Sequence, residues 1–525
     1  MITVGMRLVE GLAARGVKVV FGIPGVHTVE LYRGLSGAPI RHITARHEAG
    51  CAFMADGYAR ASGQPGVAFV ITGPGVLNAM TPMAQAKADS VPMLVISGVN
   101  ARHSLGRGLG YLHEMPDQAG VVAALCPTRR LNEPADLGAM LDWAFATMTG
   151  GRPTPVHIEI PTDVMPMECA ALPMPVDLRA TGVIDPAALQ RAAHRLNTAQ
   201  RVVILAGGGA RGCASDLQAL ALALDAPVVQ TVNARGMMYG HALTVPASPS
   251  LTTVRGLIAG ADQVLALGTE IGPTDYDMYA LGGVPDLSGM IRVDICPTQL
   301  ARHAAAVTLQ ADAGAAMRAL LPMVVARKGN GGIRAAAARH AARAELATLD
   351  PDMPERLQMI EVIRGAIPQA QIVGDSTQPI YAANLYYDHD RAGGWFNAAT
   401  GFGALGYGPG AAIGAALAQP DAHTVCLIGD GGLQFSAAEL RTAVDAKIPM
   451  TFLVWNNAAY AEIADAMRAA NTEVIGCNPT PLNLGAFAEA CDMQFASVPM
   501  EPEVLHWALA QPCDRPRLIE IRVTD

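Results

Sequence analysis

The sequence predicts an α/β protein built from three doubly wound parallel sheets. Short apolar runs alternate with helix-like stretches along all 525 residues, which is the pattern of parallel strands covered by helices on both faces. The length corresponds to roughly three or four domains. Hydrophobic residues make up 51% of the chain and charged residues 16%, so there is enough apolar material for several cores and no indication of long disorder.

Two stretches interrupt this alternation and give the domain boundaries. Residues 167–182 are rich in proline, and residues 326–345 are charged and punctuated by glycine. We interpret both stretches as linkers. The expected domains are therefore an N-terminal domain over 1–165, a central Rossmann-like domain over 185–325 and a C-terminal domain over 350–525.

Each expected domain contains buried strands that end in turns rich in glycine or proline. Residues 46–61 of the first domain have the pattern of a helix between two such strands. The expected strands lie within residues 17–25, 66–75 and 91–99 of the first domain, 201–212, 261–270 and 290–297 of the second, and 371–379, 423–432 and 450–457 of the third.

Charge and cysteine usage exclude several classes of partner. The net charge of −9 and the lack of a Lys/Arg-rich run argue against nucleic acid. The nine cysteines are scattered without a CxxC pair, which favours a reducing cytoplasm over a disulfide framework or a zinc site. Residues 1–16 are typical of an amphipathic helix and not of a signal peptide. No apolar run reaches the roughly 18–20 residues that span a membrane.

Polar residues follow two successive strands of the third domain. One apolar strand stops at Gly429, Asp430 and Gly431, and the next stops at Asn456 and Asn457 after an intervening 24 residues that hold one helix and one strand. Ends of successive parallel strands share one edge of a sheet, so the two groups should meet there. Glycines let phosphates approach the backbone, and the side-chain oxygens suit magnesium. A lone GDG would be an ordinary turn; the spacing and strand context favour a metal-diphosphate site.

This arrangement resembles the thiamine diphosphate-dependent enzymes, whose fingerprint is GDG, a gap of this length and then NN. The resemblance implies that Asp430 and Asn457 are magnesium ligands and that the backbone carbonyl of Ala459 is a third. It also implies that the flanking residues Gly429, Gly431 and Asn456 contact the coenzyme.

The same resemblance identifies a glutamate far away in the sequence. "ITARHEAGCAFMADGYAR" (43–60) matches the element that places a carboxylate beside the aminopyrimidine ring, and the carboxylate is Glu48. A carboxylate bonded to a ring nitrogen favours the imino tautomer, whose imine removes the proton from the thiazolium carbon. The alternative is a solvated residue near a helix start. "FGIPG" (21–25), with Pro24 and Gly25 at the coenzyme, matches acetolactate synthase-like members.

Further matches complete the implied coenzyme site. In "FNAATGFGALGYG" (396–408), Leu405 would be the apolar wedge that bends the coenzyme, and the Gly403 carbonyl would accept a hydrogen bond from the aminopyrimidine. In "GDSTQPIY" (374–381), Ser376 and Gln378 would touch the diphosphate.

The resemblance spans essentially the whole chain and implies a pyrimidine-binding, a central and a diphosphate-binding domain. The family builds each active site between two subunits, so a homodimer is the minimum and a homotetramer is common. Acetolactate synthases bind flavin through an arginine-containing motif after an "ALG" strand, whereas "LALGTEIGPTDYD" (265–277) has no arginine. We therefore expect a mainly structural central domain and doubt that FAD binds, with nucleotide binding as the alternative.

Three residues bear on the substrate. Glu462 stands where the family lines its substrate pocket; it either pairs with a cationic substrate tail or points to solvent from a short helix. His27 and His113 could each shuttle a proton near neutral pH, or each could be structural.

The segments 99–118 and 21–35 look most like the bacterial 5-guanidino-2-oxopentanoate (2-ketoarginine) decarboxylases of arginine catabolism. A guanidinium tail would give Glu462 a bidentate partner. The implied reaction is thiamine diphosphate- and magnesium-dependent decarboxylation of this 2-oxo acid to 4-guanidinobutanal and carbon dioxide. The alternatives are acetolactate synthase-type carboligation of pyruvate and a non-catalytic thiamine diphosphate-binding protein, which would not require Glu48.

Overall fold

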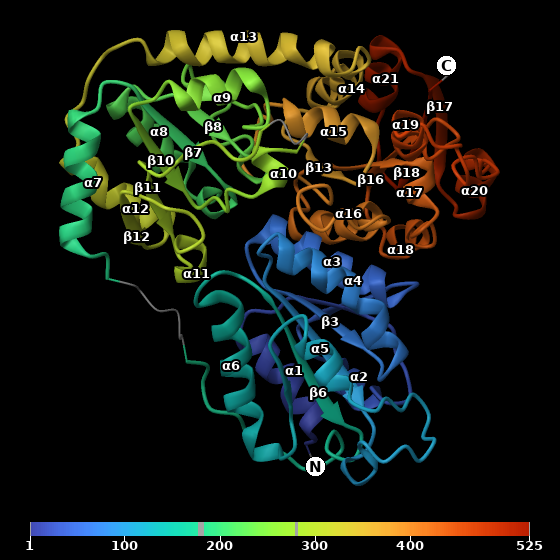
Figure 1. Cartoon of the computed structure of the whole chain (residues 1–525). Coiled ribbons are helices and arrows are strands. Elements are labelled where there is room, and N and C mark those ends of the chain that lie inside the picture. The colour runs from blue at the N-terminus through green and yellow to red at the C-terminus, as the bar shows by residue number, and fades with distance from the viewer. Residues whose placement is uncertain (1, 177–182, 279–281, 524–525) are drawn as a thin grey trace. The chain divides into compact units, whose positions relative to one another are not determined.

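The computed structural model describes residues 2–176, 183–278 and 282–523, and these form three six-stranded sheets with helices between the strands (Figure 1). Neighbouring strands run parallel in all three sheets, as in the pairs β1–β3, β7–β10 and β15–β16. The predicted fold class is confirmed. The domain boundaries themselves remain predictions.

The first sheet has the strand order β2-β1-β3-β4-β6-β5. Strands β4 and β6 are buried along their whole length, which is why they appear as nearly continuous apolar runs. The strands are β1 Val19–Gly22, β2 Arg41–Thr44, β3 Gly66–Val70, β4 Met93–Val99, β5 Thr128–Arg130 and β6 Pro155–Pro161, and the helices are α1 Val4–Ala14, α2 Val29–Leu35, α3 Glu48–Ser62, α4 Pro74–Ala88, α5 Gln118–Ala123 and α6 Leu137–Thr149.

The second sheet has the order β12-β11-β10-β7-β8-β9. Alternate residues of its strands point to one face of the sheet, where they pack with buried helix side chains in a hydrophobic cluster. The strands are β7 Val202–Ala206, β8 Val228–Gln230, β9 Thr244–Val245, β10 Gln263–Leu267, β11 Ile291–Asp294 and β12 Val307–Gln310, and the helices are α7 Pro186–Thr198, α8 Ala214–Leu224, α9 Thr252–Ala259, α10 Pro273–Tyr276, α11 Pro297–Leu300 and α12 Ala313–Leu320.

The third sheet has the order β14-β13-β15-β16-β18-β17. Its strands are β13 Gln371–Gly374, β14 Trp395–Asn397, β15 Thr424–Gly429, β16 Met450–Asn456, β17 Gln494–Pro499 and β18 Arg517–Arg522, and the helices are α14 Met353–Ala366, α15 Gln378–Leu385, α16 Tyr407–Ala418, α17 Asp430–Leu433, α18 Glu439–Asp445, α19 Ala461–Ala469, α20 Leu484–Ala490 and α21 Pro502–Ala510.

The chain divides into two compact units. The first comprises Met1–Ala180, Gly401–Ser497 and Pro512–Arg522, and the second comprises the rest. No helix among the described residues is both long and apolar enough to cross a membrane.

The stretch 326–345, predicted as a linker, is mostly a helix. Helix α13, Gly331–Leu349, occupies it (Figure 1). Its run of alanines has high helix propensity, and Ala335, Ala342 and Leu346 form part of a buried stripe. The stretch therefore has regular structure, and its role as a boundary between two domains stays a prediction. Residues 177–182 of the other predicted linker lie outside the described part of the chain.

Helices α3 and α16, both in the first unit, pack at close backbone distance (Figure 1). A Cβ atom at Gly57 would lie 1.9 Å from the carbonyl oxygen of Ala411, and one at Gly414 would lie 1.9 Å from that of Met54. Glycine at these positions is therefore what allows the two helices to touch. The contact matters for function because α3 begins at Glu48 and α16 follows the Gly403–Leu405 loop.

Gly57→Ala is expected to lower the free energy of unfolding by about 1–3 kcal/mol, because the added methyl group overpacks this contact. The matched control is Gly365→Ala in α14, where a Cβ atom meets nothing within 4 Å and alanine should be neutral or stabilising by about 0.5–1 kcal/mol. Urea denaturation of both variants measures the difference. Equal midpoints would contradict the packing argument.

Candidate active site

The structure brings Asp430 and Asn457 together at one edge of the third sheet. Strands β15 and β16 pair in parallel with Gly429 opposite Trp455. Asp430 directly follows β15, and Asn457 directly follows β16. The backbone N–H of Asn457 donates a hydrogen bond to the Asp430 carboxylate. The predicted juxtaposition of these two residues is therefore present.

The Asp430 carboxyl is buried and is influenced by the charge of a second acid, Glu520. Asp430 is only 5% exposed. Burial raises the pKa of the Asp430 carboxyl, hydrogen bonds from the N–H groups of Asn457 and Gly431 oppose that rise, and the charge of Glu520 adds to it. A cation bound beside Asp430 would offset the cost of burying its charge.

The turn after β16 is held by its two amides. Asn456 Nδ2 donates to Glu520 Oε1 at 2.6 Å, and Asn456 Oδ1 accepts from the N–H of Ala458 at 3.1 Å. Asn457 Oδ1 accepts from the N–H of Ala459 at 3.2 Å. An amide oxygen has two lone pairs and can accept more than one contact. Asn456 thus shapes the turn, and Asn457 can serve a ligand.

This donor set suits magnesium. Within the described residues, no group of three or more His, Cys, Asp and Glu side chains is arranged to hold a metal. An ion here would instead take one carboxylate oxygen, the Asn457 amide oxygen and the Ala459 carbonyl, with diphosphate oxygens in addition. Hard oxygen ligands with few protein carboxylates are what magnesium uses when it binds a phosphorylated ligand.

Gly431 is required by packing at the same turn. A Cβ atom there would lie 2.5 Å from Cε1 of Tyr460. Gly429 precedes α17 in an extended conformation, with φ −75° and ψ 153°. The two glycines around Asp430 therefore leave the strand end open while Tyr460 covers one side.

Glu48 is the first residue of α3. Its Oε2 accepts a hydrogen bond from Asn78 Nδ2 at 2.9 Å, and its side chain is half-buried. A Cβ atom at Gly75 would lie 3.5 Å from Glu48 Oε1. Asn78 and Gly75 both belong to α4, so this helix orients the carboxylate from one side while leaving it partly open.

Sequence reasoning missed Glu439, which contacts the segment just before Glu48. The Glu439 residue is 1% exposed, and its carboxylate accepts hydrogen bonds from the backbone N–H groups of Arg46 and His47. A signal was present: Glu439, Thr442 and Ala443 recur at helical spacing on the buried face of α18, where a carboxylate is unusual. No comparable sequence pattern marked Asn78 or Glu520 as part of the site.

His27 and His113 lie against each other. Their ring centroids are 5.4 Å apart at an interplanar angle of 83°. Burial, and then the neighbouring His113, lowers the pKa of His27. Pro24 and Gly25 lie in the turn that precedes His27, where the Gly25 N–H donates to Thr28 Oγ1 at 3.2 Å. The two histidines that the sequence named separately therefore form one pair.

The Gly403–Leu405 loop is anchored from α4. The N–H of Ala404 donates to Oε1 of the buried Gln85 at 3.1 Å. Gly403 has φ +74°, a conformation that favours glycine. Leu405 is 40% exposed, which leaves an apolar side chain available to a ligand.

Three further predicted residues lie on other elements. Ser376 and Gln378 follow β13 in the second compact unit, and their contact with a diphosphate stays a prediction. Glu462 lies in the first turn of α19 with its side chain exposed, so its pairing with a substrate also stays a prediction.

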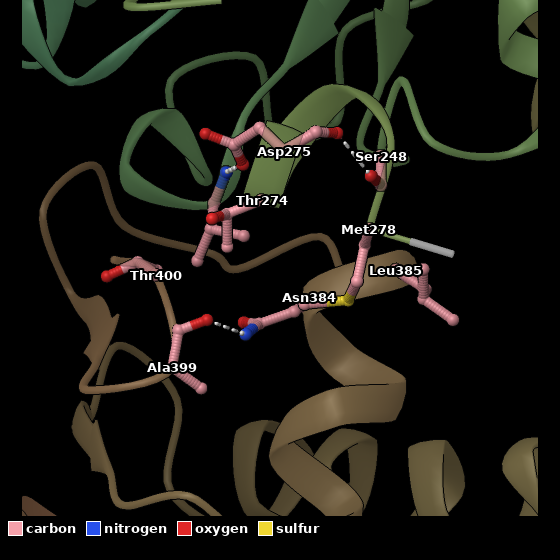
Figure 2. A pocket seen from close by; sticks show the side chains of 9 residues that line it. Ser248, Thr274, Asp275, Met278, Asn384, Leu385, Ala399 and Thr400 are labelled. Carbon is pink, nitrogen blue, oxygen red and sulfur yellow. Dashed lines mark hydrogen bonds between the residues drawn. The ribbon is translucent and has the colours of Figure 1, made fainter. Parts of the chain in front are cut away.

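Two hollows in the second unit contain none of the predicted site residues. The first is the pocket in Figure 2, where Ser248 bonds to the Asp275 carbonyl and Asn384 to the Ala399 carbonyl. Its space of about 10 Å³ holds roughly one water molecule. The second has about 380 Å³ and is lined in part by Arg339. Neither hollow therefore corresponds to the predicted coenzyme site.

Parallel α/β domains with polar residues at the carboxyl ends of their strands are typical of enzymes that bind phosphorylated ligands. Three family profiles match the chain. They are the N-terminal TPP binding domain, the central domain and the C-terminal TPP binding domain of thiamine pyrophosphate enzymes, over residues 2–121, 189–320 and 375–521 respectively.

Curated proteins are similar over most of the chain. "Probable 2-ketoarginine decarboxylase AruI" of Pseudomonas aeruginosa is 42% identical over 493 residues, which cover 91% of this chain and 86% of that protein. "Acetolactate synthase isozyme 1 large subunit" of Escherichia coli is 29% identical over 471 residues, covering 86% and 81%. "Probable acetolactate synthase large subunit" of Methanocaldococcus jannaschii is 28% identical over 482 residues, covering 86% and 79%.

The chain therefore belongs to the thiamine pyrophosphate (thiamine diphosphate) enzyme family. It is a thiamine diphosphate-dependent enzyme, of the 2-oxo acid decarboxylase or acetolactate synthase-like kind.

Proposed function

We propose that the enzyme decarboxylates 5-guanidino-2-oxopentanoate to 4-guanidinobutanal and carbon dioxide, with thiamine diphosphate and magnesium as cofactors. The observation that carries the substrate is the 42% identity, over 91% of the chain, to a protein named as a 2-ketoarginine decarboxylase. The Asp430–Asn457 pair supports the metal. A role in arginine catabolism follows from this substrate, and it belongs to the proposal together with a cytoplasmic location.

The protein would hold and orient the two cofactors. Asp430, Asn457 and the Ala459 carbonyl would hold magnesium against the diphosphate, while Leu405 and the Gly403 carbonyl would orient the coenzyme rings. When bound, thiamine diphosphate supplies an electron sink for the pair left behind as carbon dioxide departs. Ser376 and Gln378 would add diphosphate contacts.

Glu48 would hold a proton at a pyrimidine ring nitrogen of the coenzyme. Asn78 fixes one carboxylate oxygen at 2.9 Å, which leaves the other free for that contact. Glu48 therefore has the geometry of an oriented acid rather than of a freely rotating surface group.

The His27–His113 pair would deliver the proton that completes the aldehyde. That proton goes to the substrate carbon that has lost carbon dioxide. With its pKa lowered by burial and by His113, His27 is neutral near pH 7. It can accept a proton and pass it on. Proton delivery at this carbon favours release of the aldehyde over attack on a second carbonyl.

A panel of 2-oxo acids tests the proposal. 2-Ketoarginine, pyruvate and benzoylformate are supplied separately with thiamine diphosphate and magnesium, and carbon dioxide and the organic product are followed. The proposal expects carbon dioxide and 4-guanidinobutanal from 2-ketoarginine. Acetolactate from pyruvate, with no turnover of 2-ketoarginine, would establish the carboligating alternative. No turnover of any 2-oxo acid despite coenzyme binding would favour a non-catalytic binding protein.

Glu462→Gln is expected to raise KM for 2-ketoarginine by about tenfold or more, because a charge-assisted bidentate contact to guanidinium is lost. Turnover of a substrate without a cationic tail, such as pyruvate, should change little. Steady-state kinetics on both substrates measures the contrast. Glu473→Gln, the same change at another exposed glutamate, is the control, and equal effects on the two substrates would remove Glu462 from the pocket.

We further propose that the active enzyme is a homodimer or homotetramer with active sites between subunits. The family's construction supports this assembly. In such an assembly, Glu48 of one chain would serve a coenzyme held by the metal site of its partner.

A further inference from the structure

The carboxylate of Glu439 lies at the entrance to helix α3. Its Oε1 accepts from the N–H of Arg46 at 3.1 Å and from the N–H of His47 at 3.1 Å. Its Oε2 accepts from Arg46 N–H at 3.3 Å and from Thr442 Oγ1 at 2.7 Å. These two backbone donors immediately precede Glu48. Glu439 therefore fixes the path of the chain into the residue that begins α3.

The space for this carboxylate is reserved by a glycine. A Cβ atom at Gly50 would lie 2.1 Å from Glu439 Oε1, so no other residue could stand there without displacing Glu439. The first N–H groups of a helix lack partners within the helix, and negative charge is favoured near them. The His47 ring completes the cap, because its Nδ1 accepts from the Ala49 N–H at 3.1 Å.

Burial and hydrogen bonding act against each other at Glu439. Burial raises the pKa of its carboxyl, while the Thr442 hydroxyl, the two backbone N–H groups and the charge of Arg46 lower it. Burial raises the pKa of the Cys51 thiol, and the negative charges of Glu439 and Glu48 raise it further. The two carboxylates therefore flank the first turn of α3.

The same short segment carries the predicted metal ligand. Asp430 begins α17 and Glu439 begins α18. One end of this segment thus holds the metal-diphosphate edge, and the other end holds the backbone that leads into Glu48.

We infer that Glu439 is a positioning residue that sets the direction of the Glu48 carboxylate through the backbone N–H groups of Arg46 and His47. This inference rests on the proposed role of Glu48 in activating the coenzyme. It implies that changes at 439 impair activation while leaving the metal and diphosphate contacts in place.

Backbone hydrogen exchange in the full chain without coenzyme provides a readout independent of turnover. In Glu439→Ala, exchange at the amides of Arg46 and His47 should accelerate by about 100-fold or more, since both lose their acceptor. kcat should fall on the order of 100-fold, as expected for a misplaced catalytic group. The coenzyme Kd, followed by tryptophan fluorescence, should stay within about threefold of the wild-type value.

Two further variants separate positioning from general damage. Glu439→Gln keeps one acceptor oxygen and should restore part of both kcat and amide protection relative to Glu439→Ala. Glu489→Gln, the same change on an exposed residue of α20, should leave all readouts unchanged. If Glu439→Ala does not fold, Thr442→Val replaces it: this variant removes only one hydrogen bond to the carboxylate and should lower kcat by about threefold to tenfold.

The outcomes distinguish this inference from the proposed function. The positioning role would be overturned if the folded Glu439→Ala protein showed wild-type amide exchange and wild-type kcat. The same holds for Thr442→Val where that variant replaces it. This conclusion would stand even if Glu48→Gln were inactive. Full turnover in Glu48→Gln would instead overturn the proposed role of Glu48, and the positioning inference with it.

Discussion

Glu48→Gln is expected to lower kcat by about 10²–10⁴-fold, the range that a positioned acid–base group supplies. The amide keeps the size of the side chain and can still accept from Asn78, which donates to Glu48 at 2.9 Å. Helix α3 should therefore begin in the same way. What is lost is the carboxyl that we propose holds a proton at the pyrimidine nitrogen.

Coenzyme binding should survive this change. The residues proposed to bind magnesium and the diphosphate at the end of β15 are untouched, so the Kd for thiamine diphosphate with magnesium should remain within about tenfold, equivalent to 1.4 kcal/mol. Stopped-flow turnover and a fluorescence titration measure the two quantities. Glu10→Gln, on the exposed face of α1, is the matched control, and near-normal turnover in Glu48→Gln would remove Glu48 from the mechanism.

Asp430→Asn is expected to weaken magnesium-dependent coenzyme binding by about 100-fold or more, because the site loses its carboxylate ligand. The chain without coenzyme should fold as well as the wild type or better. An amide at this 5% exposed position avoids burying a charge and can still accept from the N–H of Asn457.

This opposite effect on stability and binding is the distinguishing result. Calorimetric titration with thiamine diphosphate and magnesium gives the affinity, and thermal unfolding without coenzyme gives the stability. Asp421→Asn, at an exposed residue just before β15, should change neither. Unaltered affinity in Asp430→Asn would mean that the ion is held elsewhere.

The largest part of the site that could be predicted is the part built from local patterns. Glycine turns after apolar runs indicate where buried strands end, and parallel strands end at one edge. From these patterns, Asp430 and Asn457 are predicted to lie close together at that edge. The family resemblance added Glu48, at the start of a helix that the apolar pattern also predicted.

Other features depended on contacts between distant segments. The Glu439 carboxylate and the Arg46 N–H are 393 positions apart, and no periodicity in either segment indicates that they touch. His27 and His113 were each named, but their edge-to-face contact depends on how two loops of the first unit pack. The stretch 326–345 forms a helix over most of its length, and its buried stripe is defined only by the packing of α13.

The sequence by itself determined the fold class, the coenzyme family and the identity of the residues at the two strand ends. The fold class and the strand ends follow from turn chemistry and from the period of apolar residues, which act over a few positions. The coenzyme family follows from the resemblance of the motifs to those of known enzymes. Only the tertiary structure decided which buried groups support those residues: Glu439 behind Glu48, Gln85 behind the Leu405 loop and Glu520 behind Asn456. Each support is a hydrogen bond between segments brought together by close packing, and packing depends on the whole folded chain.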